Sequence, residues 1–152
     1  CIRDRSSSVQ PRISRERIRV PLDQISISDQ SSWRKLHLPR RDDLVMQFLR
    51  GGYLKNITRI PILRNFNGKP RFGTDGRRLL IDGKSTTAAL LQCMEVYSAS
   101  QDGQVFPERC YDFTESLVSV FTEGLECLVG ELEDDSEDVI FAYCVGIHDA
   151  IA

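Results

Sequence analysis

The stretch that decides the fold is Arg77–Val96, with the sequence RRLLIDGKSTTAALLQCMEV. The apolar run Leu79–Ile81 predicts a short strand, and the apolar spacing from Ala88 to Tyr97 predicts a helix. The polar residues Asp82–Thr87 lie between them, in a turn that ends the strand and opens the helix. Such a turn presents unpaired backbone N–H groups at the positive end of the helix dipole. We therefore expect the turn to bind phosphate or another anion.

The turn and its flanking strands hold the residue types that phosphate binding requires. Lys84 adds a positive charge, Gly83 allows close approach of the backbone, and the three residues after Lys84 carry hydroxyl groups. Arginines on the flanking predicted strands would complete a pocket that binds an anion. The alternative interpretation is an ordinary helix cap with a solvated lysine. The candidate phosphate-binding residues are Asp82, Gly83, Lys84, Ser85, Thr86, Thr87, Arg64 and Arg78.

The elements around the turn predict an α+β fold with a small mixed sheet and helices. Pro61 cannot donate to a strand ladder, which places it at a sheet edge or a strand end. Hydrophobic periodicity and turn residues predict, in chain order, a strand over Ile18–Ile27, a helix opened by Arg41-Asp42-Asp43 and ended by Gly51-Gly52, a strand over Ile57–Leu63 and a hairpin turn at Asn65–Pro70.

The chain of 152 residues divides into three parts. Residues 1–16 are basic and Ser-rich and indicate a flexible arm, residues 17–100 form the α+β domain, and residues 107–152 form an acidic helical extension that we expect to pack on the same domain. The stretch Ser98–Gly103 is small and polar and predicts a linker or an exposed loop.

The acidic extension is expected to be helical throughout. Asp112 followed by Glu115 predicts a helix N-cap. The apolar residues from Leu117 to Leu132 fit one long helix, weakened near its two glycines. A last helix is predicted from Ser136 through Ile147.

Charge is distributed unevenly along the chain. Residues 1–103 hold 19 basic and 10 acidic residues, whereas residues 104–152 hold 1 basic and 12 acidic residues. One interpretation is that the two parts attract each other within one domain. The other is that the basic part binds nucleic acid or a nucleotide while the acidic helices bind a basic protein.

Composition narrows the functional classes. No apolar run approaches the roughly 20 residues that cross a bilayer, so no membrane partner is expected. The five cysteines form no C-x-x-C motif, which favours a reducing intracellular setting in cytoplasm or nucleus, with an organelle also open. The chain has two histidines, which offer few ligands for a zinc site and few candidates for a histidine-based catalytic triad. No metal site is predicted.

Gly83-Lys84-Ser85 matches the end of the P-loop pattern G-x-x-x-x-G-K-[ST]. The first glycine of that pattern would stand at position 78, which is Arg78, and an apolar strand occupies the place of the phosphate-wrapping loop. A P-loop-like NTPase is therefore a weaker alternative. A nuclease that uses Asp82 with a divalent ion is another.

A larger part of the chain resembles a known family. IRVPLDQISI at 18–27, the helix before Gly51-Gly52, YLKNITRIPILR at 53–64 and LLIDG at 79–83 together resemble the N-terminal domain of the ParB/sulfiredoxin superfamily. The resemblance implies an α+β fold in which the turn after a strand holds phosphate. Members include nucleotide-binding DNA-segregation proteins, nucleases and an ATP-using sulfinic acid reductase.

Two departures bear on function. The arginine of the family motif corresponds to Thr86, and the turn contains no cysteine for sulfiredoxin chemistry. The resemblance implies a ParB-like domain that binds a nucleotide or nucleic-acid phosphate at the DGKSTT turn, and a nucleoside triphosphate with Mg²⁺ is the cofactor that it admits. Catalysis stays open. The alternative is a non-catalytic protein-interaction module with a degenerate site.

Overall fold

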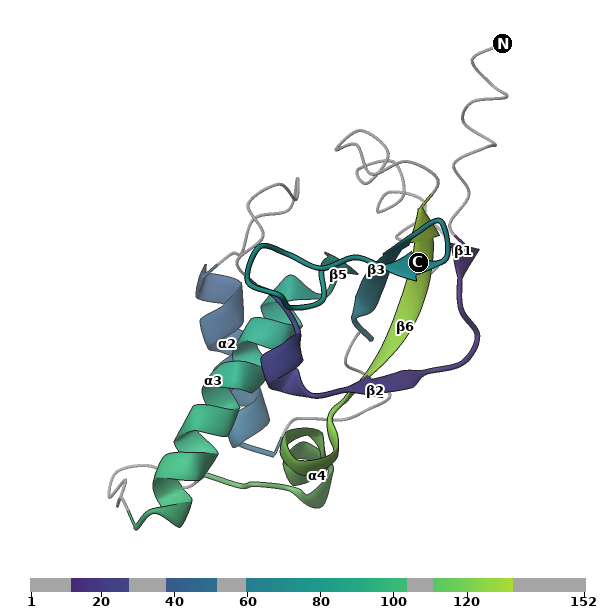
Figure 1. The fold of residues 1–152 in the computed structure, drawn as a ribbon. Coiled ribbons are helices and arrows are strands. Elements are labelled where there is room, and N and C mark those ends of the chain that lie inside the picture. Colours follow the sequence, from purple (N-terminus) through teal and green to yellow (C-terminus); the bar gives the residue numbers. More distant parts are fainter. Residues whose placement is uncertain (1–11, 28–37, 52–59, 104–110, 133–152) are drawn as a thin grey trace.

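The computed structural model describes residues 12–27, 38–51, 60–103 and 111–132 (Figure 1). Within these ranges the chain forms a mixed sheet of six strands with α-helices packed against it, so the predicted α+β class is confirmed. The helices are α2 (Leu38–Leu49), α3 (Lys84–Gln101) and α4 (Glu115–Glu123), together with the short 3₁₀ helix η1 (Leu22–Gln24).

The centre of the sheet is a parallel pair of strands from distant parts of the sequence. Strand β3 (Ile62–Phe66) pairs with strand β6 (Leu125–Leu132) over five registered positions, from Ile62 opposite Leu128 to Phe66 opposite Leu132. All other described strands pair antiparallel with one of these two. The strands β1 (Arg12–Ile13) and β2 (Ile18–Val20) pair with β6, and β4 (Lys69–Pro70) and β5 (Leu80–Asp82) pair with β3.

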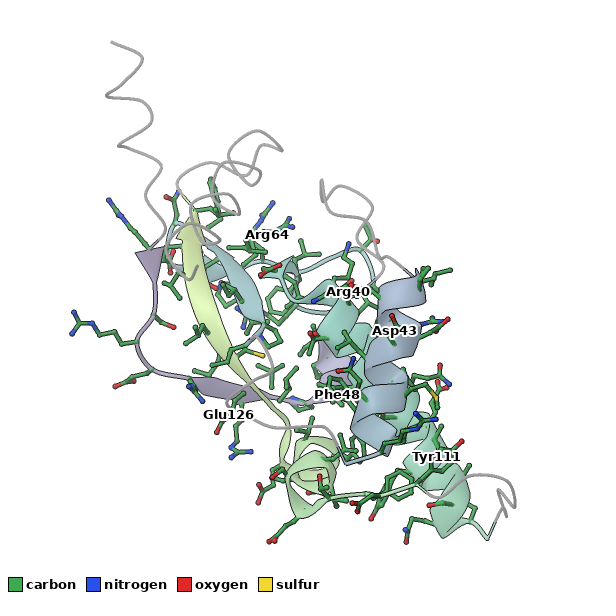
Figure 2. The ribbon with its side chains drawn as sticks, turned by 180° about the vertical axis from the view of Figure 1, so that it is seen from behind. Arg40, Asp43, Phe48, Arg64, Tyr111 and Glu126 are labelled. Carbon is green, nitrogen blue, oxygen red and sulfur yellow. The ribbon has the colours of Figure 1, made fainter. Side chains whose placement is uncertain are left out.

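Each face of the sheet has its own apolar cluster, because neighbouring residues of a strand point to opposite faces. The face with Leu63 and Leu80 packs on the helices, with Phe48 of α2 lying in the layer between (Figure 2). The opposite face holds a smaller cluster around Ile62, Ile81 and Leu132. The larger cluster also includes Val20, Leu22, Ile25, Leu49, Ala89, Leu90, Cys93, Leu117, Val120, Leu125 and Cys127.

The predicted hairpin turn at residues 65–70 is confirmed. Phe66 lies opposite Lys69, so only Asn67 and Gly68 connect β3 to β4. Both have positive φ, 52° and 74°, as the two central residues of a type I′ turn require. An Asn-Gly pair adopts this conformation at low cost and matches the twist of the strands.

The predicted long helix over residues 117–132 is wrong. Helix α4 ends at Glu123, Gly124 is its C-cap, and Leu125–Leu132 form β6. Gly124 has a φ of 101°, and a Cβ at this position would lie 3.0 Å from the carbonyl atoms of Val20. The apolar spacing misled because the buried residues of β6 fall on both faces, Leu125 and Cys127 on one and Leu132 on the other, so the strand shows no clean alternation. The backbone groups of β6 form hydrogen bonds with β1, β2 and β3 instead of with one another in a helix.

The N-cap of α4 also differs from the prediction. Thr114 caps the helix, its Oγ1 accepting a hydrogen bond from Leu117 N at 3.3 Å. Asp112, the predicted cap, lies outside the helix and donates its backbone N–H to the Leu49 carbonyl at 2.7 Å. This bond ties the segment before α4 to the end of α2.

The ends of several other elements differ from the predicted ones. The predicted strand 18–27 breaks after Val20, where Pro21 precedes η1. Helix α2 begins at Leu38, three residues before the predicted Arg41, and the strand predicted from Ile57 starts at Ile62, with 57–59 outside the described residues. Helix α3 runs through most of the predicted linker Ser98–Gly103 and ends at Gln101.

Part of the segment predicted as an arm, residues 1–16, lies on the sheet, and residues 1–11 lie outside the described residues. Arg12–Ile13 form β1 on β6, and the Ser14 hydroxyl accepts from Val129 N at 2.9 Å. These bonds occupy strand positions that a solvated arm would leave open. The helix predicted over 136–147 and the acidic residues 133–138 lie outside the described residues. Of the described helices, none has the length and apolar character needed to span a bilayer.

Replacing Leu63 tests the central strand pair. Leu63 is fully buried between the sheet and the helices, so Leu63→Ala should lower the free energy of unfolding by about 2–5 kcal/mol in urea denaturation. The exposed α3 residue Gln92 provides the control, and Gln92→Ala should change stability by less than about 0.5 kcal/mol. Equal losses for the two variants would contradict the assigned core.

Candidate functional site

The predicted anion-binding turn connects β5 directly to α3. Strand β5 ends at Asp82, Gly83 adopts a left-handed conformation with a φ of 100°, and α3 begins at Lys84. The first helical bond runs from Thr87 N to the Gly83 carbonyl at 3.0 Å. The N–H groups of the three preceding residues therefore have no carbonyl within the helix to bind. The first turn of α3 contains no acidic residue.

Packing leaves only part of this turn accessible. Asp82 is 4% exposed, and Thr86 and Thr87 are buried. A Cβ on Gly83 would lie 2.7 Å from Pro61 Cα, so the turn rests directly on the residue that precedes β3. The Thr87 hydroxyl donates to the Gly83 carbonyl at 2.9 Å and is used within the helix. Lys84 and Ser85 are half-buried and form the accessible part of the turn.

The two candidate arginines are engaged in the sheet. The Arg64 side chain is buried on β3, and its Nη2 donates to the Leu80 carbonyl at 2.9 Å (Figure 2). The Arg78 Nη2 donates to Asn65 Oδ1 at 3.0 Å, and Asn65 in turn donates to Glu131 Oε1 at 2.9 Å. Because Arg78 precedes β5 and the turn follows it, the structure does not bring Arg78 to the turn.

The connection between β5 and α3 bears on the P-loop alternative. Only Gly83 separates the strand from the helix. A single residue cannot wrap successive N–H groups around a phosphate chain, as a P-loop does.

The described residues also contain no group of three or more His, Cys, Asp or Glu residues arranged to hold a metal ion.

A cleft of about 750 Å³ adjoins the turn, and sequence reasoning missed it. Thr86 and Pro61 line it on the side of the turn, and α4 with the start of β6 lines it on the other. Three hydroxyl-bearing residues of α4 line it, Ser116, Ser119 and Thr122. Their helical spacing is visible in the sequence, but assigning residues 125–132 to the same helix concealed the cleft.

The charged rim of the cleft joins the basic and acidic parts of the chain. Glu126 accepts from Arg17 at 3.3 Å and from Arg19 at 3.2 Å, and Arg19 also lies 3.4 Å from Glu123. These contacts support the interpretation that the two parts compensate each other within one domain. Nearly half of each arginine side chain is exposed, so each ion pair contributes about 0–1 kcal/mol and can open for a ligand.

The described cysteines are structural. Cys93 and Cys127 are both buried and free. Burial raises the pKa of each thiol to about 12, although the charge of Arg78 opposes the rise at Cys127. Since the thiolate is the nucleophile, neither residue is suited to covalent catalysis near neutral pH.

Comparison with known proteins returned no relative: no protein-family model, no curated protein and no solved structure matches the chain. The resemblance to the ParB/sulfiredoxin superfamily therefore stays a prediction.

Two glycines with positive φ test how closely the turn is packed. Gly76 has a φ of 76°, and a Cβ at this position would meet nothing within 4 Å, so Gly76→Ala should cost only the backbone strain of about 1–2 kcal/mol. Gly83→Ala adds a clash with Pro61 and should cost about 1–3 kcal/mol more in urea denaturation. Equal costs would show that the turn does not rest on Pro61.

Proposed function

We propose that the turn at the start of α3 binds the phosphate of a nucleotide or nucleic acid, with a mononucleotide as the best fit. One observation carries the proposal: the N-terminus of an 18-residue helix presents Lys84 and Ser85, and its third residue, Thr86, lines a cleft of about 750 Å³. A single ligand would then place its phosphate at the turn and its remaining atoms in the cleft.

Each residue of the turn has a distinct part in this proposal. The N–H groups of Lys84, Ser85 and Thr86 donate to phosphate oxygens, and the helix dipole favours the negative charge. The Lys84 ammonium neutralises that charge, and the Ser85 hydroxyl donates a further bond. Gly83 contributes its left-handed backbone, which turns the chain from β5 into α3 within one residue.

The cleft favours a small ligand. Its volume lies within the roughly 300–1,000 Å³ of typical small-molecule sites. Serine and threonine hydroxyls and the carboxylates of Glu123 and Glu126 offer partners for sugar hydroxyls and base edges. Because Thr86 replaces the family arginine, its hydroxyl cannot form the two parallel bonds of a guanidinium, and we expect moderate affinity.

The proposal is confined to binding. Asp82, the acid considered for a divalent ion, is buried at the end of β5. A buried carboxylate is poorly placed to hold an ion that keeps several water molecules, as Mg²⁺ does.

Titration with a fluorescent ATP analogue tests the site. Lys84→Ala should weaken binding about tenfold, because a charge-assisted contact to phosphate contributes roughly 1.5 kcal/mol or more. Arg50→Ala removes an exposed cation after the end of α2 that does not line the cleft, and it should bind like the wild type. Lys84→Arg keeps the charge and should bind as well as the wild type or better.

Two results would contradict this proposal. One is the absence of binding by the folded wild-type protein at millimolar nucleotide. The other is equal affinity for the Lys84→Ala and Arg50→Ala variants, which would assign any binding to general charge.

A further inference from the structure

A second cationic surface lies away from the α3 turn. It consists of residues Asn67–Arg78, which comprise the tip of the β3–β4 hairpin and the loop from β4 to β5; we call it the hairpin–loop surface. Figure 1 shows this segment in teal, running across the end of the sheet where β5 lies. It holds four cationic residues, Lys69, Arg71, Arg77 and Arg78, against one acid, Asp75.

The acids at this surface are engaged in holding its backbone and side chains: Glu131 of β6 accepts from Gly68 N at 3.0 Å and from Asn65 Nδ2 at 2.9 Å, and Asp75, the one acid within residues 67–78, holds the loop. Asp75 Oδ2 accepts from the Ser26 hydroxyl at 2.9 Å, and Oδ1 accepts from Arg77 N at 3.0 Å. In contrast, the exposed side chains of Lys69 and Arg77 form no ion pair with any described residue. The positive charges of Lys69 and Arg77 are therefore available to an anionic partner.

An aromatic ring stands within this charge. Phe72 is 56% exposed, the largest exposed fraction among the large apolar residues described. The Arg78 guanidinium lies 5.8 Å from the Phe72 ring centroid, within cation–π range. A bridge between the backbones of Phe72 and Arg78 fixes the backbone that carries the ring. Arg71 makes a similar contact at 5.6 Å to the Phe66 ring.

The backbone beneath the ring is fixed by hydrogen bonds. Arg71 N donates to the Arg64 carbonyl at 3.0 Å, and Leu79 N donates to the Arg71 carbonyl at 3.0 Å. Within the loop, Gly73 N donates to the Arg77 carbonyl at 2.8 Å. The Arg78 guanidinium is fixed by Asn65, and burial lowers its pKa below the ordinary value. The backbone of the loop therefore loses little conformational freedom when a ligand stacks on Phe72.

We propose that the hairpin–loop surface binds single-stranded nucleic acid, with a base stacked on Phe72 and phosphates held by Lys69 and Arg77. An exposed aromatic ring within a cationic surface is the arrangement that takes unpaired bases, since every base has a stacking face. A duplex buries those faces between its base pairs and would use only the charges. An acidic peptide likewise would use the charges without needing the ring.

This inference does not rest on the phosphate site at the α3 turn. The two sites use different residues at different places in the fold. The proposal for a mononucleotide depends on Lys84, and the proposal for a strand of nucleic acid depends on Phe72. Variants of each residue therefore separate the two.

Fluorescence anisotropy with a labelled oligothymidylate of about 12 nucleotides, at about 50 mM salt, provides the test. Phe72→Ala should weaken binding about 5- to 150-fold, the loss typical of removing one base–aromatic stack. Phe72→Leu keeps an apolar side chain without a ring and should lose most of the affinity, whereas Phe72→Trp should keep it. Arg77→Glu should weaken binding and flatten its dependence on salt.

Controls separate stacking from charge and from misfolding. Because Phe72 is exposed, its variants should unfold at the same temperature as the wild type by circular dichroism. Arg50→Ala removes an exposed cation outside the hairpin–loop surface and should bind the oligonucleotide like the wild type. A duplex of the same length and a poly-glutamate peptide should compete poorly.

The proposal is overturned if the wild type does not bind the oligonucleotide, or if Phe72→Ala binds as tightly as the wild type. It is also overturned if duplex or poly-glutamate competes as well as the single strand, because charge alone would then explain binding. If Lys84→Ala loses binding while Phe72→Ala retains it, the nucleic acid binds at the α3 turn. That result would overturn this inference and support the first proposal.

Discussion

The parallel pairing of β3 with β6 is the constraint on which the rest of the structure depends. It joins Ile62–Phe66 to Leu128–Leu132, segments more than 60 residues apart, and the other described strands pair with one of the two. Pro61 sits at the junction, its carbonyl accepting from Leu128 N at 3.0 Å while its ring lies against Gly83. The strand pairing, the α3 turn and the adjoining cleft therefore share one residue.

This arrangement explains why the two proposed sites lie apart. Strand β5 pairs with β3 next to Ile62 and leads into Gly83, so the α3 turn meets Pro61 at the start of β3. The β3–β4 hairpin is at the other end of β3, where Arg78 reaches Asn65. The same strand thus separates a turn beside a cleft, for which we propose a small ligand, from a cationic surface, for which we propose a strand of nucleic acid.

The sequence predicted features that depend on local chemistry. The Asn67-Gly68 turn and the strand–turn–helix around Gly83 follow from backbone preferences of a few residues, and both were correct. It failed where tertiary contacts decide. Residues 125–132 carry helical spacing but form the central strand, because β1, β2 and β3 satisfy their backbone groups. The cleft depends on that strand, so it could not be predicted, and the roles of Arg64 and Arg78 depend on strand register.

The central claim is that the start of α3 is a phosphate site and not only a helix cap. A titration of ¹⁵N-labelled protein with ADP, followed by ¹H–¹⁵N correlation NMR, tests it most directly. The claim predicts that the largest shift changes fall on the amides of Lys84, Ser85 and Thr86 and extend to Ser119 and Thr122 across the cleft. Unchanged amides at the start of α3 under saturating ADP, or changes confined to other surfaces, would contradict it.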